Sequence, residues 1–145
     1  MRILVDTNIL TALSQRQSPH FTSLRQTLSR LLKQGDVPCI AAQNLIEYWT
    51  VATRPIDVNG LGLDFHASLI ELEKFKRYFE FIPTTAETYL QWEKLMAKYQ
   101  VKGKQSHDTY LVAAMMEHRI SRILTFNSKD FRRFDEINVI DPRNT

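Results

Sequence analysis

The sequence predicts an α/β fold, a three-layer α/β/α sandwich around a central parallel sheet of about five strands. The first observation is the run Ile3-Leu4-Val5, which is apolar without alternation and is typical of a strand buried on both faces. The second observation is that further short apolar runs recur along the chain, separated by segments with helical periodicity. Strands joined through helices pair in parallel, because each connection crosses the sheet.

Each element follows from a local pattern. Strands are expected in the short apolar runs at residues 3–5, 37–41, 81–82, 122–126 and 137–140. Helices are expected where apolar residues share a helical face or fill the segment, at residues 9–13, 21–32, 43–53, 65–79, 89–99 and 106–116. Gly35 predicts the end of the first long helix, and Pro55 predicts the end of the next one because it disfavours the helical conformation of Arg54. The segment from Pro55 to Gly62 is predicted to be a loop.

Composition indicates one compact domain spanning residues 1–145. The chain is 43% hydrophobic and 24% charged, which is close to the average for globular domains, and its net charge of +3 points only weakly to polyanionic partners. Cys39 is the only cysteine, and the strand that begins directly after Met1 leaves no room for a signal peptide. No apolar run approaches the roughly 20 residues that cross a bilayer. We therefore expect a cytoplasmic protein without membrane association.

Several common chemistries do not fit the sequence. The four glycines form no phosphate-binding loop and no dinucleotide-binding fingerprint. The four histidines show no zinc-ligand spacing with the single cysteine. A phosphatase of the haloacid dehalogenase type would need an acid two residues after Asp6, where Asn8 stands.

Three acids occupy positions that need an explanation. Asp6 ends the first strand, Glu47 lies on the helix after the second strand, and Asp108 opens a nearly all-apolar helix that begins near Ser106. If the first strand is central, the carboxyl ends of neighbouring strands meet at one edge of the sheet, and the three acids share a pocket there. Each acid also has a purely structural explanation. Asp6 or Asn8 could cap the next helix, Asp108 could favour a helix N-terminus, and Glu47 could lie at the surface.

A metal ion would explain why three carboxylates lie together. Clustered carboxylates repel one another and raise each other's pKa, so the cluster needs a source of positive charge. A hard divalent cation such as Mg²⁺ or Mn²⁺ is the simplest source, because it prefers oxygen ligands and retains waters.

Four segments occur in an order that points to a known family. They are the strand that ends in Asp6-Thr7-Asn8, the segment Asn44–Tyr48 around Glu47, the segment His107–Ala114 around Asp108, and the segment Ile123–Phe131. Each segment is a weak motif alone, but the ordered set is more specific and covers nearly the whole chain. The sequence thus resembles the PIN-domain ribonucleases, and in particular the VapC-type toxins of type II toxin–antitoxin systems.

The resemblance implies a PIN-like fold and a metal-dependent endoribonuclease. Asp6, Glu47 and Asp108 would be the catalytic residues and would hold one or two Mg²⁺ or Mn²⁺ ions. Thr7 and Asn8 would orient ligands or waters around the ion. An antitoxin protein would be the cognate partner, and a homodimer is a further expectation.

The chain departs from the family at the fourth acidic position, where Asn127 stands. An amide oxygen can still ligate a hard cation, and Asn127 could also orient ligands or waters. Asp130, three residues further on, is the other candidate for the fourth ligand and could instead cap a helix.

Basic residues predict where RNA phosphates bind. Lys102 and Lys104 lie in the polar loop just before Asp108, and Arg54 follows the helix that carries Glu47. Such contacts would position RNA rather than read its sequence. The alternative for both lysines is that they only contribute to solubility.

Two other functions compete with the nuclease hypothesis. One is a catalytically degenerate PIN-like module that binds RNA or a partner, which would need no cation. The other is a metal-dependent phosphatase that acts on small molecules, which would hydrolyse a generic phosphate ester but not RNA.

Overall fold

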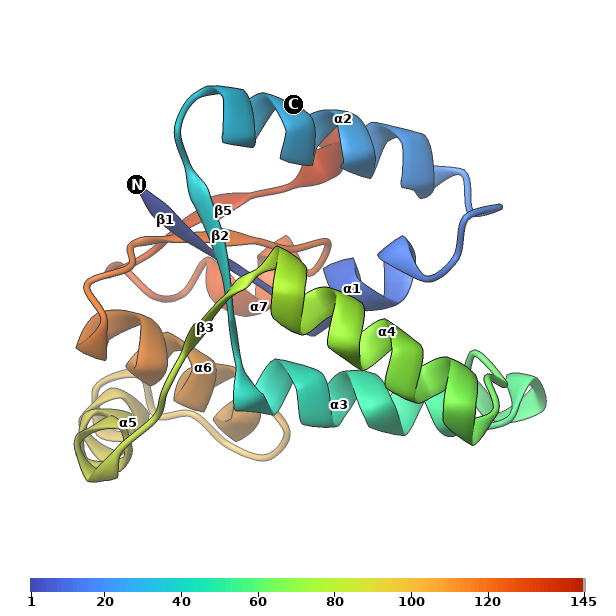
Figure 1. Ribbon diagram of the computed structural model, residues 1–145. Coiled ribbons are helices and arrows are strands. Elements are labelled where there is room, and N and C mark those ends of the chain that lie inside the picture. Colours follow the sequence, from blue (N-terminus) through green and yellow to red (C-terminus); the bar gives the residue numbers. More distant parts are fainter. Residues whose placement is uncertain (145) are drawn as a thin grey trace.

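The computed structural model describes residues 1–144 and contains a five-stranded parallel sheet with helices on both faces (Figure 1). The strands lie in the order β3-β2-β1-β4-β5, and all four neighbouring pairs are parallel. The strands are β1 (Arg2–Val5), β2 (Val37–Ala41), β3 (Glu80–Ile82), β4 (Arg122–Leu124) and β5 (Asn138–Ile140). The predicted three-layer sandwich with a central parallel sheet is therefore confirmed.

Helices connect the strands in the described part of the chain. The α-helices are α1 (Thr7–Leu13), α2 (His20–Lys33), α3 (Ala42–Thr53), α4 (Phe65–Tyr78), α5 (Ala86–Tyr99), α6 (Gln105–Glu117) and α7 (Ser128–Phe131). Two short 3₁₀ turns, η1 (Ile56–Val58) and η2 (Pro142–Asn144), complete the elements. None of the helices in residues 1–144 combines the length and the apolar character needed to span a membrane.

The central strand β1 is buried on both faces, which explains its unbroken apolar sequence. Leu4 pairs with Cys39 of β2 on one side and with Ile123 of β4 on the other. Its side chain joins one hydrophobic cluster, while Ile3 and Val5 join the other. Alternate residues of a strand point to opposite faces, so a strand between two helical layers needs apolar residues at every position.

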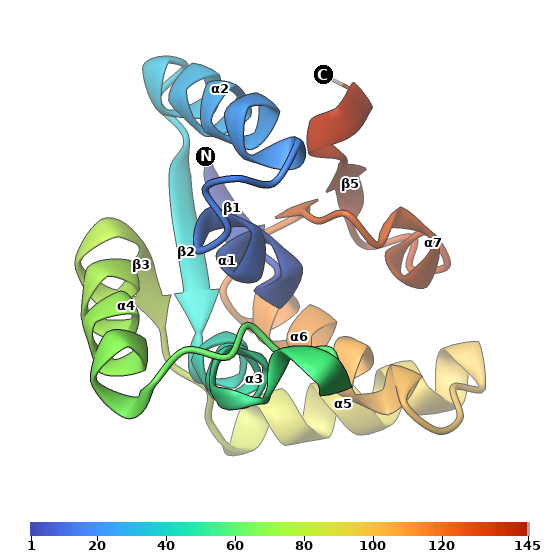
Figure 2. The same cartoon turned by 90° about the vertical axis from the view of Figure 1, so that its right-hand side faces the viewer.

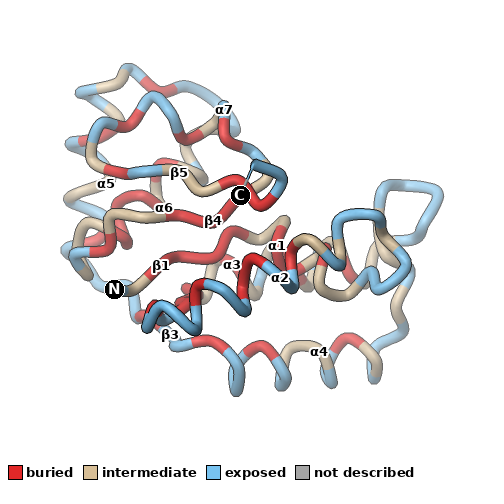
Figure 3. Tube along the Cα trace, turned by 90° about the horizontal axis from the view of Figure 1, so that it is seen from above, coloured by how far each residue is buried: buried red, intermediate tan, exposed pale blue. Residues whose placement is uncertain are grey.

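The two hydrophobic clusters each pack one layer of helices against a face of the sheet. Figure 2 shows how these helices are arranged around the strands. One cluster joins the sheet to α5 and α6 and contains Leu95 and Met115. The other joins the sheet to α1, α2, α3 and α4 and contains Leu24 and Phe75. Seen from above, buried residues run along β1 and β4 between these layers (Figure 3). The sheet is thus covered on both faces, as parallel sheets generally are.

The order of the strands brings three chain segments to one edge of the sheet. Asp6 stands between the end of β1 and the start of α1, and α3 begins directly after β2. The predicted strand at residues 122–126 ends earlier, at Leu124, because the Phe126 amide donates to Asn8 Oδ1 at 3.2 Å. The residues that follow β4 therefore turn toward the end of β1, at the edge where open α/β sheets place their ligands.

Candidate functional site

Asp6 lies at the junction of β1 and α1 and is 7% exposed. Its Oδ1 accepts from the Thr7 amide at 2.8 Å, so it caps α1. Its Oδ2 accepts from the Thr125 hydroxyl at 2.7 Å and from Asn8 Nδ2 at 3.3 Å. A cap needs only the first of these contacts. The second oxygen is held by side chains from two separate segments, so capping alone does not explain this carboxylate.

Glu47 lies on α3, half-buried, and is tied to the same junction through Thr7. The Thr7 hydroxyl donates to Glu47 Oε1 at 3.1 Å and accepts from Asn44 Nδ2 at 3.3 Å. Asn44 is fully buried, and its Oδ1 accepts from the Ala41 amide at 2.9 Å at the start of α3. The end of β2 thus fixes Asn44, which in turn fixes the hydroxyl that holds Glu47.

Asp108 lies half-buried in the first turn of α6. Two neighbouring carbonyl groups fix this turn against other helices. Gln43 Nε2 of α3 donates to the His107 carbonyl at 2.8 Å, and Trp92 Nε1 of α5 donates to the Ser106 carbonyl at 2.8 Å. The start of α6 is therefore held toward the start of α3, and Asp108 is held beside Asp6 and Glu47.

The pKa of Asp6 reports the crowding of negative charge. Burial raises this pKa to about 6, against the hydrogen bonds from Thr125 and Thr7, which lower it. The charges of Glu47 and Asp130 also contribute to this increase. The carboxylate thus interacts with two other acids.

Asp108 shows the same crowding more strongly. Burial, together with the charges of Asp6, Asp130 and Glu47, raises its pKa to about 7. Among residues 1–144, none of these four acids forms an ion pair with a basic side chain. Four carboxylates therefore lie together at one edge, and no basic side chain in the described residues is paired with them.

This donor set fits a hard divalent cation by charge and by ligand type. All four side chains offer oxygen donors, which Mg²⁺ and Mn²⁺ prefer. Over the described residues, however, no three acidic, histidine or cysteine side chains are placed to ligate one ion directly. Mg²⁺ keeps several waters and is usually bound through one or two carboxylates, so the arrangement fits an ion that some of these acids contact through water.

The two candidates for the fourth position differ in their surroundings. Asn127 is exposed, and its backbone amide donates to the Thr125 hydroxyl at 2.9 Å. It is the N-cap residue of α7, but its side chain makes no capping bond. Asp130 lies half-buried in the first turn of α7, and its charge acts on both Asp6 and Asp108. Of the two side chains, only that of Asp130 contributes negative charge to the cluster.

The three basic residues predicted to contact RNA lie in different settings. Lys102 and Lys104 are exposed in the turn before α6, on the approach to Asp108. Arg54 follows the last residue of α3, and its Nη2 donates to the Asn59 carbonyl at 3.1 Å. The Arg54 carbonyl accepts from the Gly62 amide at 2.9 Å, so this residue secures its own loop. The side chains of the two lysines form no hydrogen bond or ion pair within residues 1–144, although the Lys104 carbonyl accepts from the His107 amide at 3.1 Å. Phosphate binding by all three residues stays a prediction.

Two residues of the site were not singled out from the sequence. Thr125 is fully buried and holds Asp6, and Asn44 is fully buried and holds Thr7. A signal for Thr125 was present, because it is a polar residue directly after the apolar pair Ile123-Leu124, as Asp6 is after Ile3-Leu4-Val5, but the strand expected at residues 122–126 included it. Asn44 carried no such signal, since an amide at the start of a helix is usually a cap or a surface residue.

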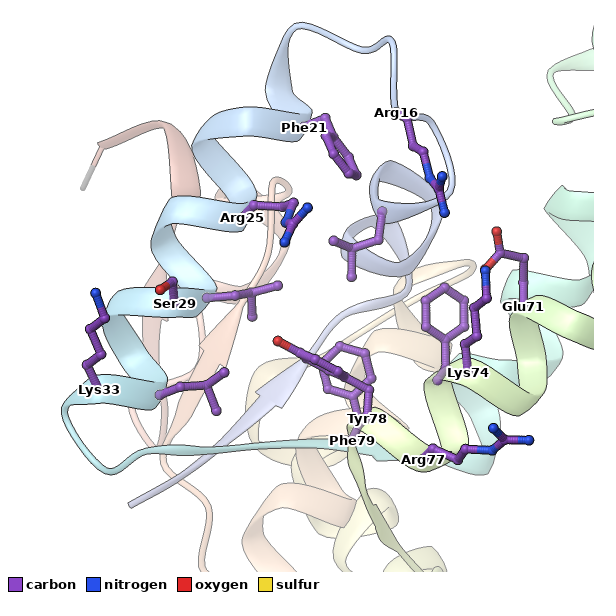
Figure 4. Close-up of a pocket in the computed structure, with 14 residues that line it drawn as sticks. Arg16, Phe21, Arg25, Ser29, Lys33, Glu71, Lys74, Arg77, Tyr78 and Phe79 are labelled. Atoms are coloured by element: carbon purple, nitrogen blue, oxygen red, sulfur yellow. The ribbon is translucent and has the colours of Figure 1, made fainter.

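A separate groove of about 980 Å³ lies between α2 and α4, and its lining includes none of the four acids of the cluster (Figure 4). Its lining combines apolar side chains with basic ones. The apolar residues are Leu13, Phe21, Leu28, Leu32, Phe75, Tyr78 and Phe79. The charged residues are Arg16, Arg25, Lys33, Lys74, Arg77 and a single acid, Glu71. The groove therefore favours a ligand that is both apolar and negatively charged.

Comparisons with known proteins agree with the fold described above. A family model described as the PIN domain matches residues 3–137, whereas no curated protein matches the chain. The chain is similar in structure to VapBC2 from Rickettsia felis bound to a promoter DNA fragment, with a TM-score of 0.76 and 16% identity over 97% of this chain and 98% of the other. It is also similar to VapBC-1 from nontypeable Haemophilus influenzae, with a TM-score of 0.74 and 17% identity over 99% of each chain. A third similar structure is VapC20 from Mycobacterium tuberculosis, a sarcin-ricin loop cleaving toxin, with a TM-score of 0.64 and 18% identity over 93% of this chain and 98% of the other.

Proposed function

This chain belongs to the PIN-domain family, and on that premise we propose that it is a metal-dependent endoribonuclease that acts as the toxin of a toxin–antitoxin pair. One observation carries the proposal. Four interacting carboxylates, those of Asp6, Glu47, Asp108 and Asp130, lie at one sheet edge without an ion-pair partner in residues 1–144. The structural likeness to VapC20, itself a toxin that cleaves the sarcin-ricin loop, adds support.

Mg²⁺ or Mn²⁺ is the proposed cofactor. Asp6, Glu47 and Asp108 would hold it, with Asp130 or Asn127 at the fourth position. When bound, such an ion stabilises the charge that develops on a phosphodiester and lowers the pKa of an attacking water. The cluster also needs this charge, because four unpaired carboxylates destabilise the folded chain.

The protein contributes orientation. Thr125, Asn8 and the Thr7 amide fix both oxygens of Asp6, and the Thr7 hydroxyl fixes one oxygen of Glu47. Ligands held by further hydrogen bonds reorganise little when charge develops during a reaction. We infer that Thr7 and Asn8 serve in this way, as the sequence predicts.

RNA would approach across the turn that precedes α6. Lys102 and Lys104 are exposed there and would hold phosphates beside the acids, which otherwise repel a polyanion. These contacts would raise affinity for any RNA sequence, because they involve the backbone alone.

The partner would be a small antitoxin protein, and we assign it to the groove between α2 and α4. The lining carries five basic side chains against one acidic one around an apolar floor, which suits an acidic, amphipathic polypeptide segment (Figure 4). Leu13, at the end of α1, lines the groove, while Asp6 caps the start of the same helix. That helix has seven residues and is therefore about 10 Å long. A polypeptide segment bound in the groove would need to extend by about this length to reach the acids.

Cleavage assays with structured and unstructured RNAs, with and without Mn²⁺, test the proposed activity. Asp6→Asn, Glu47→Gln and Asp108→Asn should each abolish cleavage while circular dichroism stays unchanged, because an amide keeps the shape and loses the charge. A variant that keeps near wild-type turnover at saturating Mn²⁺ would show that its residue is misassigned. Hydrolysis of a generic phosphate ester without RNA cleavage would favour the phosphatase, and RNA binding without cleavage or Mn²⁺ binding would favour the degenerate module.

A further inference from the structure

Residues 125–128, called the loop below, lead from β4 into the first residue of α7 and carry two groups of the site. Thr125 holds Asp6, and Asn127 occupies the fourth position. A hydroxyl group has one proton and two lone pairs. The Thr125 oxygen accepts from Asn8 Nδ2 at 3.2 Å and from the Asn127 amide at 2.9 Å, which leaves its proton for Asp6. A carboxylate can only accept, so this hydrogen bond requires the hydroxyl to lie at Asp6 with its proton free, and the conformation of the loop sets that position.

The last described residues hold this loop from outside. Arg143 Nη2 donates to the Phe126 carbonyl at 2.8 Å, and the guanidinium carbon lies 5.6 Å from the centroid of the Phe126 ring. The Ser128 hydroxyl donates to Asp141 Oδ2 at 3.0 Å. The two contacts lie on either side of Asn127. The loop is thus fixed at the residues before and after the fourth position.

Arg143 and Asp141 form one unit. Asp141 is buried, and its Oδ1 accepts from the Arg143 amide and from Arg143 Nε, both at 2.9 Å. Arg143 Nη2 also donates to Asp141 Oδ2 at 2.6 Å. The 3₁₀ turn η2, which carries Arg143, packs against α2, and Figure 1 shows the end of the chain beside that helix. Asp141 therefore fixes the position of the guanidinium group that contacts the loop.

We propose that Arg143 and Asp141 are positioning residues of the acid site. They hold the loop of residues 125–128 so that Thr125 donates to Asp6 and Asn127 stays at the edge of the cluster. Weaker positioning of Asp6 should lower the affinity of the acids for Mn²⁺. This expected effect rests on the proposed function, in which the acids bind the ion. The competing explanation is that the pair only ties down the end of the chain.

The test compares Arg143→Gln and Arg143→Lys with the control Arg133→Gln. Arg133 is exposed and lies beyond α7, so its substitution removes the same charge without removing a contact to the loop. Hydrogen–deuterium exchange of the amides in residues 125–128 reports the loop directly and does not depend on nuclease activity. Calorimetric titration with Mn²⁺ reports the acid site, and RNA cleavage at limiting and saturating Mn²⁺ reports activity.

Arg143→Gln should speed exchange in the loop and weaken Mn²⁺ binding by about tenfold, equivalent to about 1.4 kcal/mol or one charge-assisted hydrogen bond. Saturating Mn²⁺ should restore cleavage. Arg143→Lys should recover only part of the affinity, because an ammonium group cannot bridge the Asp141 carboxylate and the Phe126 carbonyl as the planar fork does. Exchange or Mn²⁺ affinity equal to that of Arg133→Gln would overturn the proposal. Absence of RNA cleavage by the wild type would overturn the proposed function alone, since loop exchange and Mn²⁺ binding are measured without RNA.

Discussion

The hydroxyl of Thr125 donates to Asp6 Oδ2 at 2.7 Å across 119 residues of sequence. It is the shortest of the three hydrogen bonds that Asp6 accepts, and it lowers the pKa of a carboxylate whose burial raises it. The contact exists because β1 and β4 are neighbours in the sheet and because Asp6 and Thr125 follow them directly. Thr125 is therefore as much a part of the site as the acid that it holds.

Thr125→Val should lower RNA cleavage at limiting Mn²⁺ by about tenfold, because valine keeps the shape of threonine and removes a hydrogen bond to a charged group. Without this bond the pKa of Asp6 rises further, so the acidic limb of the pH–rate profile should move to higher pH. Thr125→Ser keeps the hydroxyl and should retain the wild-type profile. Equal profiles for the valine and serine variants would show that the hydroxyl does not act on Asp6.

Asp108→Asn should stabilise the metal-free protein at pH 8. The pKa of Asp108 is raised from 3.8 to about 7 in the folded protein, so the folded state binds a proton that the unfolded state lacks between these values. Wild-type stability from this group therefore falls as the pH rises through 7. The variant avoids this loss and should be more stable at pH 8 by on the order of 2 kcal/mol, with a smaller margin at pH 5.

Chemical denaturation in chelator at both pH values measures this difference. Asp57→Asn serves as the control, because Asp57 is exposed in η1. Added Mn²⁺ should reverse the order by stabilising the wild type more than Asp108→Asn. A variant that is less stable than the wild type at pH 8 would instead support Asp108 as a favourable charge at the N-terminus of α6.

Two substitutions at the fourth position separate its candidates. Asp130→Asn should weaken Mn²⁺ binding by about tenfold, since the charge of Asp130 acts on both Asp6 and Asp108. Asn127→Asp should tighten Mn²⁺ binding and raise cleavage at limiting metal, with little gain at saturation. Calorimetric titration decides between them, with Asp135→Asn as an exposed acidic control. Unchanged affinity in Asp130→Asn together with a gain in Asn127→Asp would assign the position to residue 127.

Charge reversal in the groove should weaken binding of the antitoxin. The double variant Arg25→Glu, Lys74→Glu places acids on both walls and should lower affinity for the polypeptide encoded beside this chain's gene by at least about tenfold. The double variant Lys94→Glu, Arg133→Glu is the matched control, because it reverses two exposed charges that do not line the groove. Pull-down after co-expression and calorimetry measure the effect. Unchanged antitoxin binding would contradict the assignment, whereas altered RNA binding or self-association would identify RNA or a second copy as the occupant.

The sequence predicted the parts of this protein that depend on local patterns. The unbroken run Ile3-Leu4-Val5 indicated a buried strand in the centre of the sheet. The carboxyl ends of parallel strands lie at the same edge of a sheet, and this rule does not depend on side-chain packing. The shared neighbourhood of Asp6, Glu47 and Asp108 followed from that rule. Each of these inferences needed only residue type and spacing.

Other parts depend on contacts between distant segments. Nothing in the sequence distinguishes Asn44, which is fully buried, from the many asparagines that start helices at a surface. The bond between Thr125 and Asp6 requires the register of β1 against β4, which periodicity does not specify. Arg54 was predicted to face phosphates, yet one of its guanidinium nitrogens contacts its own loop, a contact that only the loop's conformation reveals. The groove needs the relative placement of α2 and α4, and no pattern within either helix encodes it.

The place of β1 in the middle of the sheet also has a consequence for protein synthesis. β1 is made before its neighbour β4, and the Thr125 hydroxyl directly after β4 follows 119 residues after Asp6. At about 5–20 residues per second, a ribosome needs roughly 6–24 seconds to cover this interval. Throughout that time the nascent chain holds its first acid without the donor that fixes it. Translation that stops before Thr125 therefore releases fragments without a complete site, and the proposed nuclease can act only after β4 and the residues that follow it have been made.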